Sequence, residues 1–361
     1  MSLLITLTAS IFILFLITSS KLITVKNGFN KCVNTSDIVN ISVIISVRNE
    51  EKEIKKLVDR LNNLIYPKNN FEIIIINDNS TDSTLDELLK NTIGFQNFVI
   101  KDLKHTGLKG KRNALAYGIQ HSKYPFVLIT DADCNPQKYW LQAYSEKFES
   151  GFDVLFGIAP FFKEKNLVNR ISCFENLRNS LFSFSMALNG LPYTSAARNM
   201  GFTKEAFNKI GGYSNTKDTL SGDDDLLLRE AVKGKLKIGI VTAKDSFVYS
   251  ETKKTFKEYF QQRARHTQTS FHYLKKHQFI LGFWHLTNLI FLFSPLLMLI
   301  NVWLGILFPA KLLVDLIVIK STQKEFGYTF SFAEIFYLQI FYELLLVVHF
   351  FNSQFSEIKW K

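Results

Sequence analysis

Asp131 and Asp133 are separated by one residue, and this spacing is the clearest indication of a functional site in the sequence. They end the largely apolar run FVLITDAD at 126–133, which reads as a buried strand. Two carboxylates at one strand end can direct oxygen ligands at a single Mg²⁺ or Mn²⁺ ion, which would bridge to a diphosphate. An isolated pair of this kind also occurs in solvated turns. We predict a metal site because the pair lies at the end of a strand, where ligands bind in such sheets.

A second acidic group, Asp223-Asp224-Asp225, precedes the helical pattern LLLREAV. A carboxylate at a helix start often serves only as a cap or as a partner of the helix dipole. Three adjacent acids exceed that need, and crowding of like charges raises the pKa of at least one of them. Such a carboxylate is suited to deprotonate a hydroxyl as a general base, and Asp223 and Asp224 are the candidates.

Two other groups of residues are candidates for ligand contacts. Lys111 and Arg112 begin a helical pattern, where they and the free N–H groups of the first turn can reach phosphate oxygens. An ordinary basic helix start is the alternative. Gln262, Arg265 and His266 lie just before an apolar segment, where basic residues are expected for membrane topology alone. That expectation does not explain the glutamine or the histidine.

The elements that position these groups are apolar runs alternating with helical patterns. Three runs, at 41–47, 71–78 and 126–133, are short and largely apolar, which is typical of strands buried on both faces of a parallel sheet. Ligands bind beyond the carboxyl ends of such strands. We therefore predict an α/β fold in which three strand ends converge on one polar site. The polar residues after the three strands are Arg48, Asn49 and Glu50, then Asp78, Asn79 and Ser80, then Asp131 and Asp133.

Apolar segments at both ends of the chain predict a membrane protein. Residues 3–18 carry no charge, and no basic residue precedes them as in a signal peptide, so we predict a membrane anchor at 1–20. Lys21, Lys26 and Lys31 follow this run. By the positive-inside rule they place the N-terminus outside and the following domain in the cytoplasm.

Two to three membrane helices are predicted near the C-terminus. The segment 279–300 reads as a strong span and 334–351 as a second. Between them, 303–319 contains Lys311 and Asp315, which are spaced to pair across one helical turn. This segment fits either a third span or a helix lying in the interface. The predicted domains are the anchor at 1–20, a catalytic domain at 40–270 and C-terminal membrane helices at 279–352.

The composition narrows the possible partners. The net charge is +11, but no basic stripe interleaved with aromatic residues accompanies it, so nucleic acid is not an expected partner. Membrane lipids with anionic headgroups and a nucleotide diphosphate account for the excess charge. The three cysteines show no C-x-x-C spacing, which argues against a disulfide framework and a zinc site and fits a reducing cytosol.

Taken in order, these motifs resemble the family 2 glycosyltransferases, which include cellulose, chitin and hyaluronan synthases and dolichyl-phosphate sugar synthases. The resemblance covers about residues 40–270. ISVIISVRNEE is similar to the family's opening strand and nucleotide-contacting turn, NDNSTDST to its D-D-G-S-x-D element, and GLKGKRNALAYGI to its G-K-x-x-A-L-N-x-G-I helix. DAD resembles its metal motif, ARNMGFTKEAFNKIGGY its acceptor-side segment, and SGDDDLLLR its E-D-x-D-L-x-x-R box.

The resemblance implies a Rossmann-like mixed sheet of the A-type glycosyltransferase fold. It also implies inverting transfer from a nucleotide-diphosphate sugar to a lipid-linked or saccharide acceptor, with Mg²⁺ or Mn²⁺ on Asp131 and Asp133. Uridine is the expected base, through Asp78. The implied setting is the bacterial inner membrane, with the catalytic domain in the cytoplasm. The residues expected to bind substrate are Val47, Arg48, Glu50, Asp78, Lys111, Asp131, Gln262, Arg265 and His266.

Two departures from the family pattern bear on mechanism. Aligning the Asp-Leu pair of the acidic box makes Asp223 the base and also places Leu226 and Arg229, whereas a Gly-Asp-Asp variant of the box makes it Asp224. Processive synthases carry Q-x-x-R-W, and His266 stands at the tryptophan position. In those relatives the tryptophan stacks on the acceptor sugar, and an imidazole offers a smaller face. Addition of a single sugar is therefore expected at least as much as polymer synthesis.

Two other functions fit part of the sequence. A nucleotidyltransferase could use the sheet and the aspartate pair, but it needs neither membrane spans nor the late acidic box. A non-catalytic, nucleotide-binding subunit of a polysaccharide-export complex would need no base, yet every expected carboxylate is present.

Overall fold

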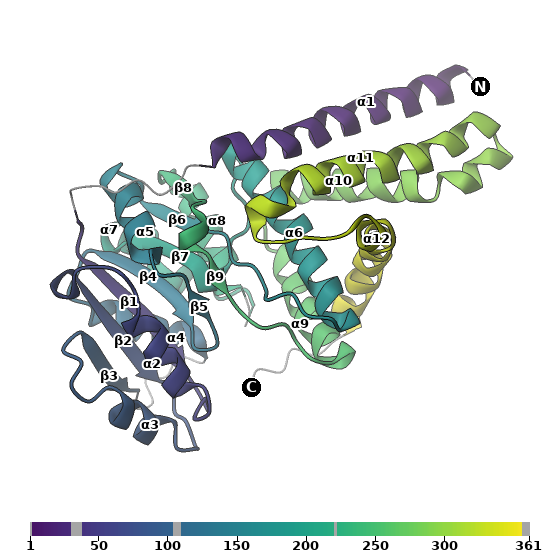
Figure 1. Ribbon diagram of the computed structural model, residues 1–361. Helices are drawn as coiled ribbons and strands as arrows, with labels where there is room; N and C mark the ends of the chain where they lie inside the picture. The colour runs from purple at the N-terminus through teal and green to yellow at the C-terminus, as the bar shows by residue number, and fades with distance from the viewer. Residues whose placement is uncertain (1, 30–37, 104–109, 220–221, 356–361) are drawn as a thin grey trace. The chain divides into compact units, whose positions relative to one another are not determined.

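The computed structural model describes residues 2–29, 38–103, 110–219 and 222–355 (Figure 1). The chain forms two compact units, and it passes between them several times along the sequence. The sheet unit is made of Asn30–Phe162 and Pro192–Glu251. The helical unit is made of Met1–Phe29, Lys163–Leu191 and Thr252–Glu357.

The sheet unit contains a seven-stranded mixed sheet with the strand order β3-β2-β1-β4-β7-β6-β8. Neighbouring strands run parallel, except that β7 pairs antiparallel with both β4 and β6. The predicted mixed α/β fold is thereby confirmed. The strands are β1 (Ile41–Val47), β2 (Phe71–Asn77), β3 (Phe98–Asp102), β4 (Phe126–Asp131), β6 (Val154–Gly157), β7 (Met200–Thr203) and β8 (Ile238–Val241), and a separate antiparallel pair is formed by β5 (Asn135–Pro136) and β9 (Val248–Tyr249).

The central strands are buried on both faces, which explains why their sequences are apolar almost without interruption. On one face, Val43 and Ile45 of β1 belong to a core cluster that includes Leu57 of α2 and Trp140 of α5. The helices of this unit are α2 (Ile54–Asn62), α3 (Thr84–Asn91), α4 (Lys111–Gln120), α5 (Trp140–Glu149), α7 (Lys204–Lys209) and α8 (Asp223–Lys233).

Helix α4 packs closely against β1 and β2. The contact point is Gly118, where an added Cβ would lie 2.6 Å from Cγ2 of Ile44 and 2.6 Å from Cδ1 of Ile76. Only a residue without a side chain allows this approach. Because α4 begins at Lys111, the same contact fixes the position of that lysine relative to the strand ends.

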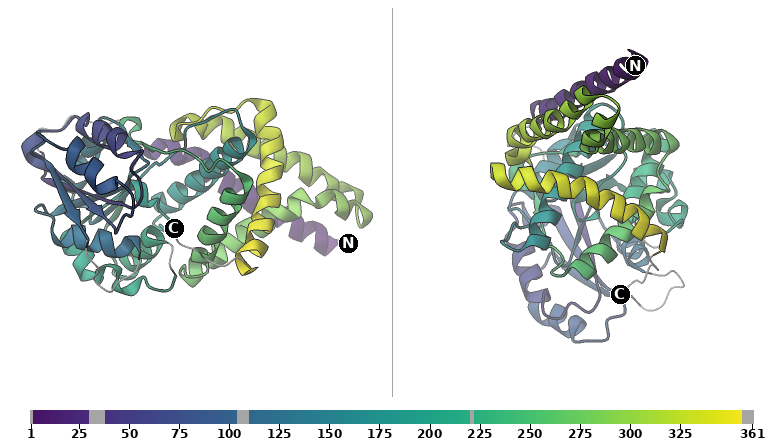
Figure 2. Two further views of the ribbon diagram at one scale, coloured as in Figure 1. Left: turned by 90° about the horizontal axis from the view of Figure 1, so that it is seen from below. Right: turned by 90° about the vertical axis from the view of Figure 1, so that its right-hand side faces the viewer.

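The helical unit is built around α11, which packs against α1, α10 and α12, while α12 also packs against α6 and α9. Figure 1 and the left view of Figure 2 show α1 running alongside α10 and α11. The helices of this unit are α1 (Ser2–Thr24), α6 (Leu167–Leu188), α9 (Phe256–Ser270), α10 (Lys275–Leu292), α11 (Leu307–Thr322) and α12 (Phe332–Phe355).

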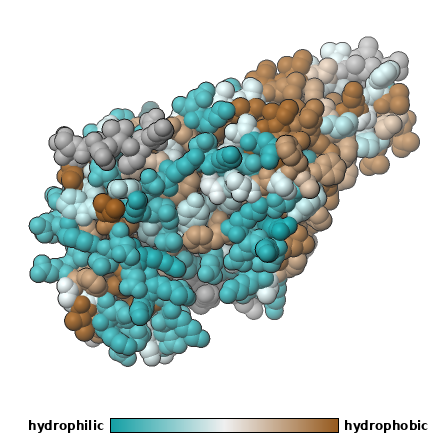
Figure 3. Space-filling model, viewed as in Figure 1, coloured by the Kyte–Doolittle hydropathy of each residue, from teal (hydrophilic) through white to brown (hydrophobic). Residues whose placement is uncertain are grey.

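Three helices among the described residues are long and apolar enough to cross a membrane: Thr6–Gly28, Val302–Phe326 and Phe332–Phe355. Hydrophobic residues gather on the surface over α1, α10 and α11, whereas the surface of the sheet unit is mostly hydrophilic (Figure 3). The segment 303–319 therefore belongs to one of the three candidate spans.

The segment 279–300 was predicted as one continuous membrane span, but its helix is interrupted. Helix α10 ends at Leu292, a 3-10 stretch (Ser294–Leu299) follows, and 279–300 is not among the three candidate spans. Pro295 accounts for the break, because proline lacks the N–H that a continuing helix needs and disfavours the helical conformation in the residue before it.

One cluster of four charged side chains is buried among the helices of this unit. Arg178 of α6 lies 2.8 Å from a carboxylate oxygen of Asp315 on α11, and Lys311 lies 2.6 Å from the other, which confirms the predicted pairing across one turn. Glu343 of α12 is 3.4 Å from both cations. Two cations face two anions, so the cluster is neutral as a whole and links three helices.

A methyl group at position 118 should force α4 away from the sheet. We expect Gly118→Ala to lower the free energy of unfolding by about 1–3 kcal/mol through overpacking, even though alanine favours a helix by about 1 kcal/mol. Gly282→Ala is the matched control, because an added Cβ on this glycine of α10 meets nothing within 4 Å. Thermal melting in detergent measures both variants. A melting temperature of Gly118→Ala equal to that of the wild type would contradict the close contact.

Candidate active site

The C-terminal ends of β1, β2 and β4 meet at one edge of the sheet. The register pairs Val47 of β1 with Asn77 of β2, and Ser46 of β1 with Asp131 of β4. Asp78, directly after β2, is 7% exposed, and its N–H donates to the carbonyl oxygen of Val47 at 2.8 Å. The structure thus brings together Val47, Asp78 and Asp131.

The loops after β1 and β2 hold each other in place. Asn49 has a left-handed backbone (φ 54°), its N–H donates to the hydroxyl of Ser80 at 3.0 Å, and its side-chain oxygen accepts the N–H of Thr81 at 2.8 Å. The N–H of Glu50 donates to the hydroxyl of Thr84 at 2.8 Å. These bonds fix the turn that carries the exposed Arg48 and the half-buried Glu50.

Asp131 and Asp133 lie with Cys134 at the end of β4. One potential ligand atom from each of the three lies within 4.8 Å of the others. The carboxylates offer the oxygen atoms that Mg²⁺ and Mn²⁺ prefer. Burial raises the pKa of the Cys134 thiol well above its usual value, so it stays protonated and is a poor ligand. The donor set therefore fits a hard divalent cation held by the two aspartates.

Lys111 joins the aspartate pair to the acidic box. Its ammonium nitrogen is 2.6 Å from Oδ1 of Asp131 and 3.4 Å from Oδ2 of Asp223. Burial alone would lower the pKa of Lys111, but the charges of Asp131 and Asp223 outweigh it and raise the pKa well above its usual value. The lysine is therefore a permanent cation between two carboxylates. Next to it, Arg112 donates to the carbonyl oxygen of Thr219 at 2.6 Å.

The three aspartates of the acidic box have different surroundings. Asp225 accepts the hydroxyl of Thr194 at 2.6 Å and the N–H of Ser195 at 3.1 Å. Asp224 accepts the N–H of Ala197 at 2.7 Å. Burial, followed by repulsion from Asp225 and Asp223, raises the pKa of the Asp224 carboxyl well above its usual value. Asp223 instead lies beside Lys111.

The loop Thr194–Asn199 holds two of the three aspartates through its N–H and hydroxyl groups. Residues 197–199 begin the segment that the resemblance assigns to the acceptor side, whereas Thr194 and Ser195 were not predicted as part of the site. Asn199 anchors this loop: its side-chain oxygen accepts Nε1–H of Trp140 and the hydroxyl of Tyr144, both at 2.8 Å. Its Nδ2 donates to the carbonyl oxygen of Ile158 at 2.8 Å. These partners lie 41 to 59 residues away, so no local pattern reports them.

The remaining predicted site residues, Gln262, Arg265 and His266, lie on α9 in the helical unit. The structure therefore does not gather them into the same unit as the strand-end residues. Their neighbour Arg263 is buried, and its Nε lies 2.7 Å from Glu175 of α6. One residue of the basic run before the C-terminal helices therefore serves to pack α9 against α6 within the helical unit.

Comparison with known proteins relates this site to a family. Residues 42–211 match the model of glycosyl transferase family 2. The probable glycosyltransferase YdaM of Bacillus subtilis is 30% identical over 206 residues, which cover 54% of this chain and 47% of that protein.

The poly-beta-1,6-N-acetyl-D-glucosamine synthase of Staphylococcus aureus is 35% identical over 101 residues, which cover 28% of this chain and 23% of that one. A dolichyl N-acetyl-alpha-D-glucosaminyl phosphate 3-beta-D-2,3-diacetamido-2,3-dideoxy-beta-D-glucuronosyltransferase of Methanococcus voltae is 36% identical over 112 residues, covering 30% and 34%. The matches span about half the length of these curated relatives or less.

The solved structure of the mannosyltransferase PcManGT of Pyrobaculum calidifontis, in complex with GDP-Man and Mn²⁺, superimposes with a TM-score of 0.59 at 16% identity. The match covers 96% of this chain and 97% of that one, and it shows a shared fold. Residues 42–211 therefore match a family 2 glycosyltransferase domain, and the mixed sheet agrees with the shared fold.

Proposed function

We propose that this chain is a membrane-bound inverting glycosyltransferase that moves a sugar from a nucleotide-diphosphate sugar to a lipid-linked or saccharide acceptor. The observation that carries the proposal is the meeting of Asp131 and Asp223 at the ammonium group of Lys111 within a family 2 domain. This meeting supports the proposal, because glycosyl transfer requires a charge-stabilising group on the diphosphate side and a base for the acceptor hydroxyl.

The proposed donor is a uridine diphosphate sugar, bound at the strand ends by Val47, Arg48, Glu50 and Asp78. Asp78, nearly buried after β2, supports a base-binding role at this edge. A guanosine sugar is the alternative, because the Pyrobaculum mannosyltransferase was solved with GDP-Man.

The proposed metal ligands are Asp131 and Asp133, whose oxygen atoms fit Mg²⁺ or Mn²⁺. A cation held by these two residues would supply positive charge to offset the negative charge of the leaving diphosphate. Lys111 is placed to donate to a phosphate oxygen on the same side, since its ammonium group already lies beside Asp131.

The proposed general base is Asp223. Asp224 and Asp225 accept hydrogen bonds from the Thr194–Asn199 loop, whereas Asp223 lies on the side of Lys111 and Asp131. In the proposed step, an oxygen of Asp223 takes the proton of an acceptor hydroxyl while that hydroxyl oxygen attacks the anomeric carbon and the diphosphate leaves.

The proposed acceptor is a lipid-linked saccharide that receives one sugar. Two relatives are named for a polysaccharide and for a dolichyl-linked sugar phosphate. His266 stands where processive members carry tryptophan, which favours single addition. We place the protein in the bacterial inner membrane with the sheet unit in the cytoplasm, because Lys21 and Lys26 lie near the C-terminal end of the first candidate span, Thr6–Gly28.

Asp223→Asn should remove the base while keeping the shape of the side chain. We expect transfer to fall by about 10²–10⁴-fold, the usual contribution of a positioned base. Asp86→Asn, at an exposed position on α3, is the matched control and should keep full activity. Initial rates with a labelled nucleotide sugar measure the effect. Turnover near the wild-type rate in a folded Asp223→Asn protein would reject Asp223 as the base.

Removal of divalent cations should stop the reaction reversibly. We expect EDTA to abolish transfer and either Mn²⁺ or Mg²⁺ to restore it, because the two strand-end aspartates offer oxygen ligands to a hard cation. Asp133→Ala should remain inactive after the metal is restored. Undiminished transfer in EDTA would contradict a metal-dependent mechanism.

Lys111→Met should leave Asp131 and Asp223 without their shared cation. We expect the metal-free protein to lose on the order of 1 kcal/mol of stability, a small value because Asp131 is partly exposed. Added Mn²⁺ should raise the melting temperature of this variant more than that of the wild type. Lys209→Met, at an exposed site at the end of α7, should behave as the wild type in both conditions. Identical Mn²⁺ shifts in the wild type and Lys111→Met would contradict the pairing.

A further inference from the structure

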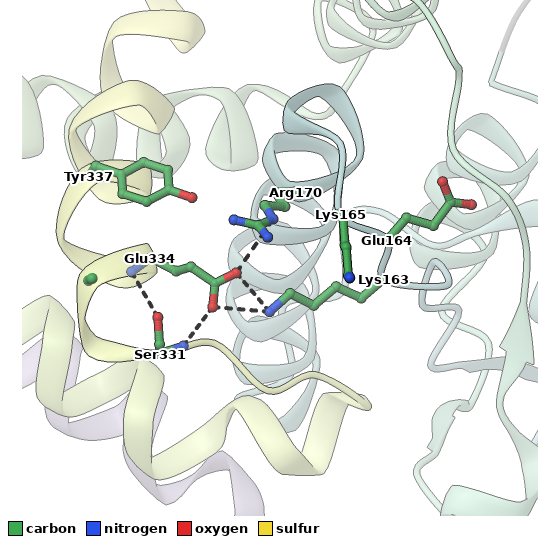
Figure 4. A pocket seen from close by; sticks show the side chains of 8 residues that line it. Lys163, Glu164, Lys165, Arg170, Ser331, Glu334 and Tyr337 are labelled. Carbon is green, nitrogen blue, oxygen red and sulfur yellow. Dashed lines mark hydrogen bonds and ion pairs between the residues drawn. The ribbon is translucent and has the colours of Figure 1, made fainter.

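A pocket of about 580 Å³ is lined by residues of the helical unit alone, and none of them belongs to the candidate active site. Figure 4 shows its side chains, which come from the start of α6 and the residues before it and from the start of α12. Those that carry the inference are Lys163, Lys165, Arg170, Ser331, Glu334 and Tyr337. We refer to it as the basic pocket.

The basic pocket holds more positive than negative charge. Lys163 lies 2.9 Å from Glu334, and Nε of Arg170 lies 3.8 Å from the same carboxylate. Glu334 also accepts the N–H of Ser331 at 2.8 Å, so it caps α12 while it faces these cations. No ion pair joins Lys165 to any residue that the structure describes. Two of the three cations therefore pair with the carboxylate of Glu334, and the third adds positive charge without a carboxylate partner in the described part of the chain.

Glu164, the second acidic residue that lines the pocket, does not neutralise the excess positive charge. Glu164 accepts a hydrogen bond from Nδ2 of Asn166 at 3.1 Å, and Figure 4 shows its carboxylate directed away from the Lys163–Glu334 pair. Tyr337 turns its hydroxyl toward Arg170 in the same view. The pocket thus combines unneutralised basic groups with a hydroxyl donor, which suits a singly charged anion with several oxygen atoms.

The basic pocket also lies where a candidate membrane span begins. Its α12 residues occupy the first two turns of Phe332–Phe355. On the same stretch Phe332 is 64% exposed and Phe336 is 57% exposed, and they are one turn apart on one face of the helix. The ammonium group of Lys320 lies 4.2 Å from the ring centre of Phe332. Basic groups beside exposed aromatic rings at a span end are typical of the lipid headgroup region.

We propose that the basic pocket binds the phosphate of an anionic membrane phospholipid. Lys165, Arg170 and the Tyr337 hydroxyl contact the phosphodiester, and the acyl chains run beside Phe332 and Phe336. A phosphodiester carries one negative charge, which matches the moderate positive excess left after Glu334 is counted. This site does not depend on the glycosyl-transfer reaction, so its failure would leave the proposed function untouched.

The test is a binding titration of the full-length protein, purified in detergent and stripped of lipid. Short-chain phosphatidylglycerol, phosphatidylcholine, polyprenyl phosphate and inorganic phosphate are added in separate arms, and calorimetry measures the affinity. We expect phosphatidylglycerol to bind most tightly. The double variant Lys165→Gln/Arg170→Gln should bind it about thirty-fold more weakly. Lys253→Gln/Lys254→Gln, which removes the same charge before α9, should bind as the wild type does.

Four results would overturn the proposal. Equal affinity for phosphatidylglycerol and phosphatidylcholine would show that the headgroup charge is not recognised. Inorganic phosphate binding as tightly as phosphatidylglycerol would identify a free-anion site. Tighter binding of polyprenyl phosphate would identify an acceptor site. Unchanged phosphatidylglycerol binding in the Lys165/Arg170 variant, with the wild-type circular dichroism spectrum, would place the lipid elsewhere.

Discussion

The ammonium group of Lys111 is the contact on which the rest of the site depends. It joins three elements that are distant in the sequence, because it begins α4, pairs with Asp131 at the end of β4 and lies beside Asp223 at the start of α8. Without a cation here, strand-end and helix-start carboxylates would face each other across a half-buried site. The close approach of α4 to the sheet at Gly118 keeps the lysine at this position.

Several features of this arrangement could be read from the sequence. Strands buried on both faces leave uninterrupted apolar runs, so β1, β2 and β4 and the acids after them were predictable from residue order alone. Residue order did not predict the pairing of Lys111 with carboxylates, nor the hydrogen bonds from the Thr194–Asn199 loop. They depend on where α4 and α8 pack on the sheet, which local patterns do not report. Hydropathy also overstated 279–300 as one span, because an average over a window ignores the helix break at Pro295.

Two clusters of charged residues in the helical unit have different consequences. Arg178, Lys311, Asp315 and Glu343 are buried and balance one another, so they link helices without leaving charge to attract a ligand. The basic pocket at the start of α12 keeps an excess of positive charge beside exposed aromatic rings. The basic pocket is therefore a candidate lipid site because its positive charge is not fully neutralised, whereas the neutral buried cluster is an internal packing contact.

The central claim is that the chain transfers a sugar from a nucleotide sugar to a membrane acceptor. Its most direct test incubates native membranes containing the protein with a panel of radiolabelled uridine and guanosine diphosphate sugars and follows both lipid-extractable and polymeric products. The account predicts label in the lipid extract from one donor, with one sugar added per acceptor. No label in either fraction from any donor, with the protein folded and nucleotide bound, would contradict it.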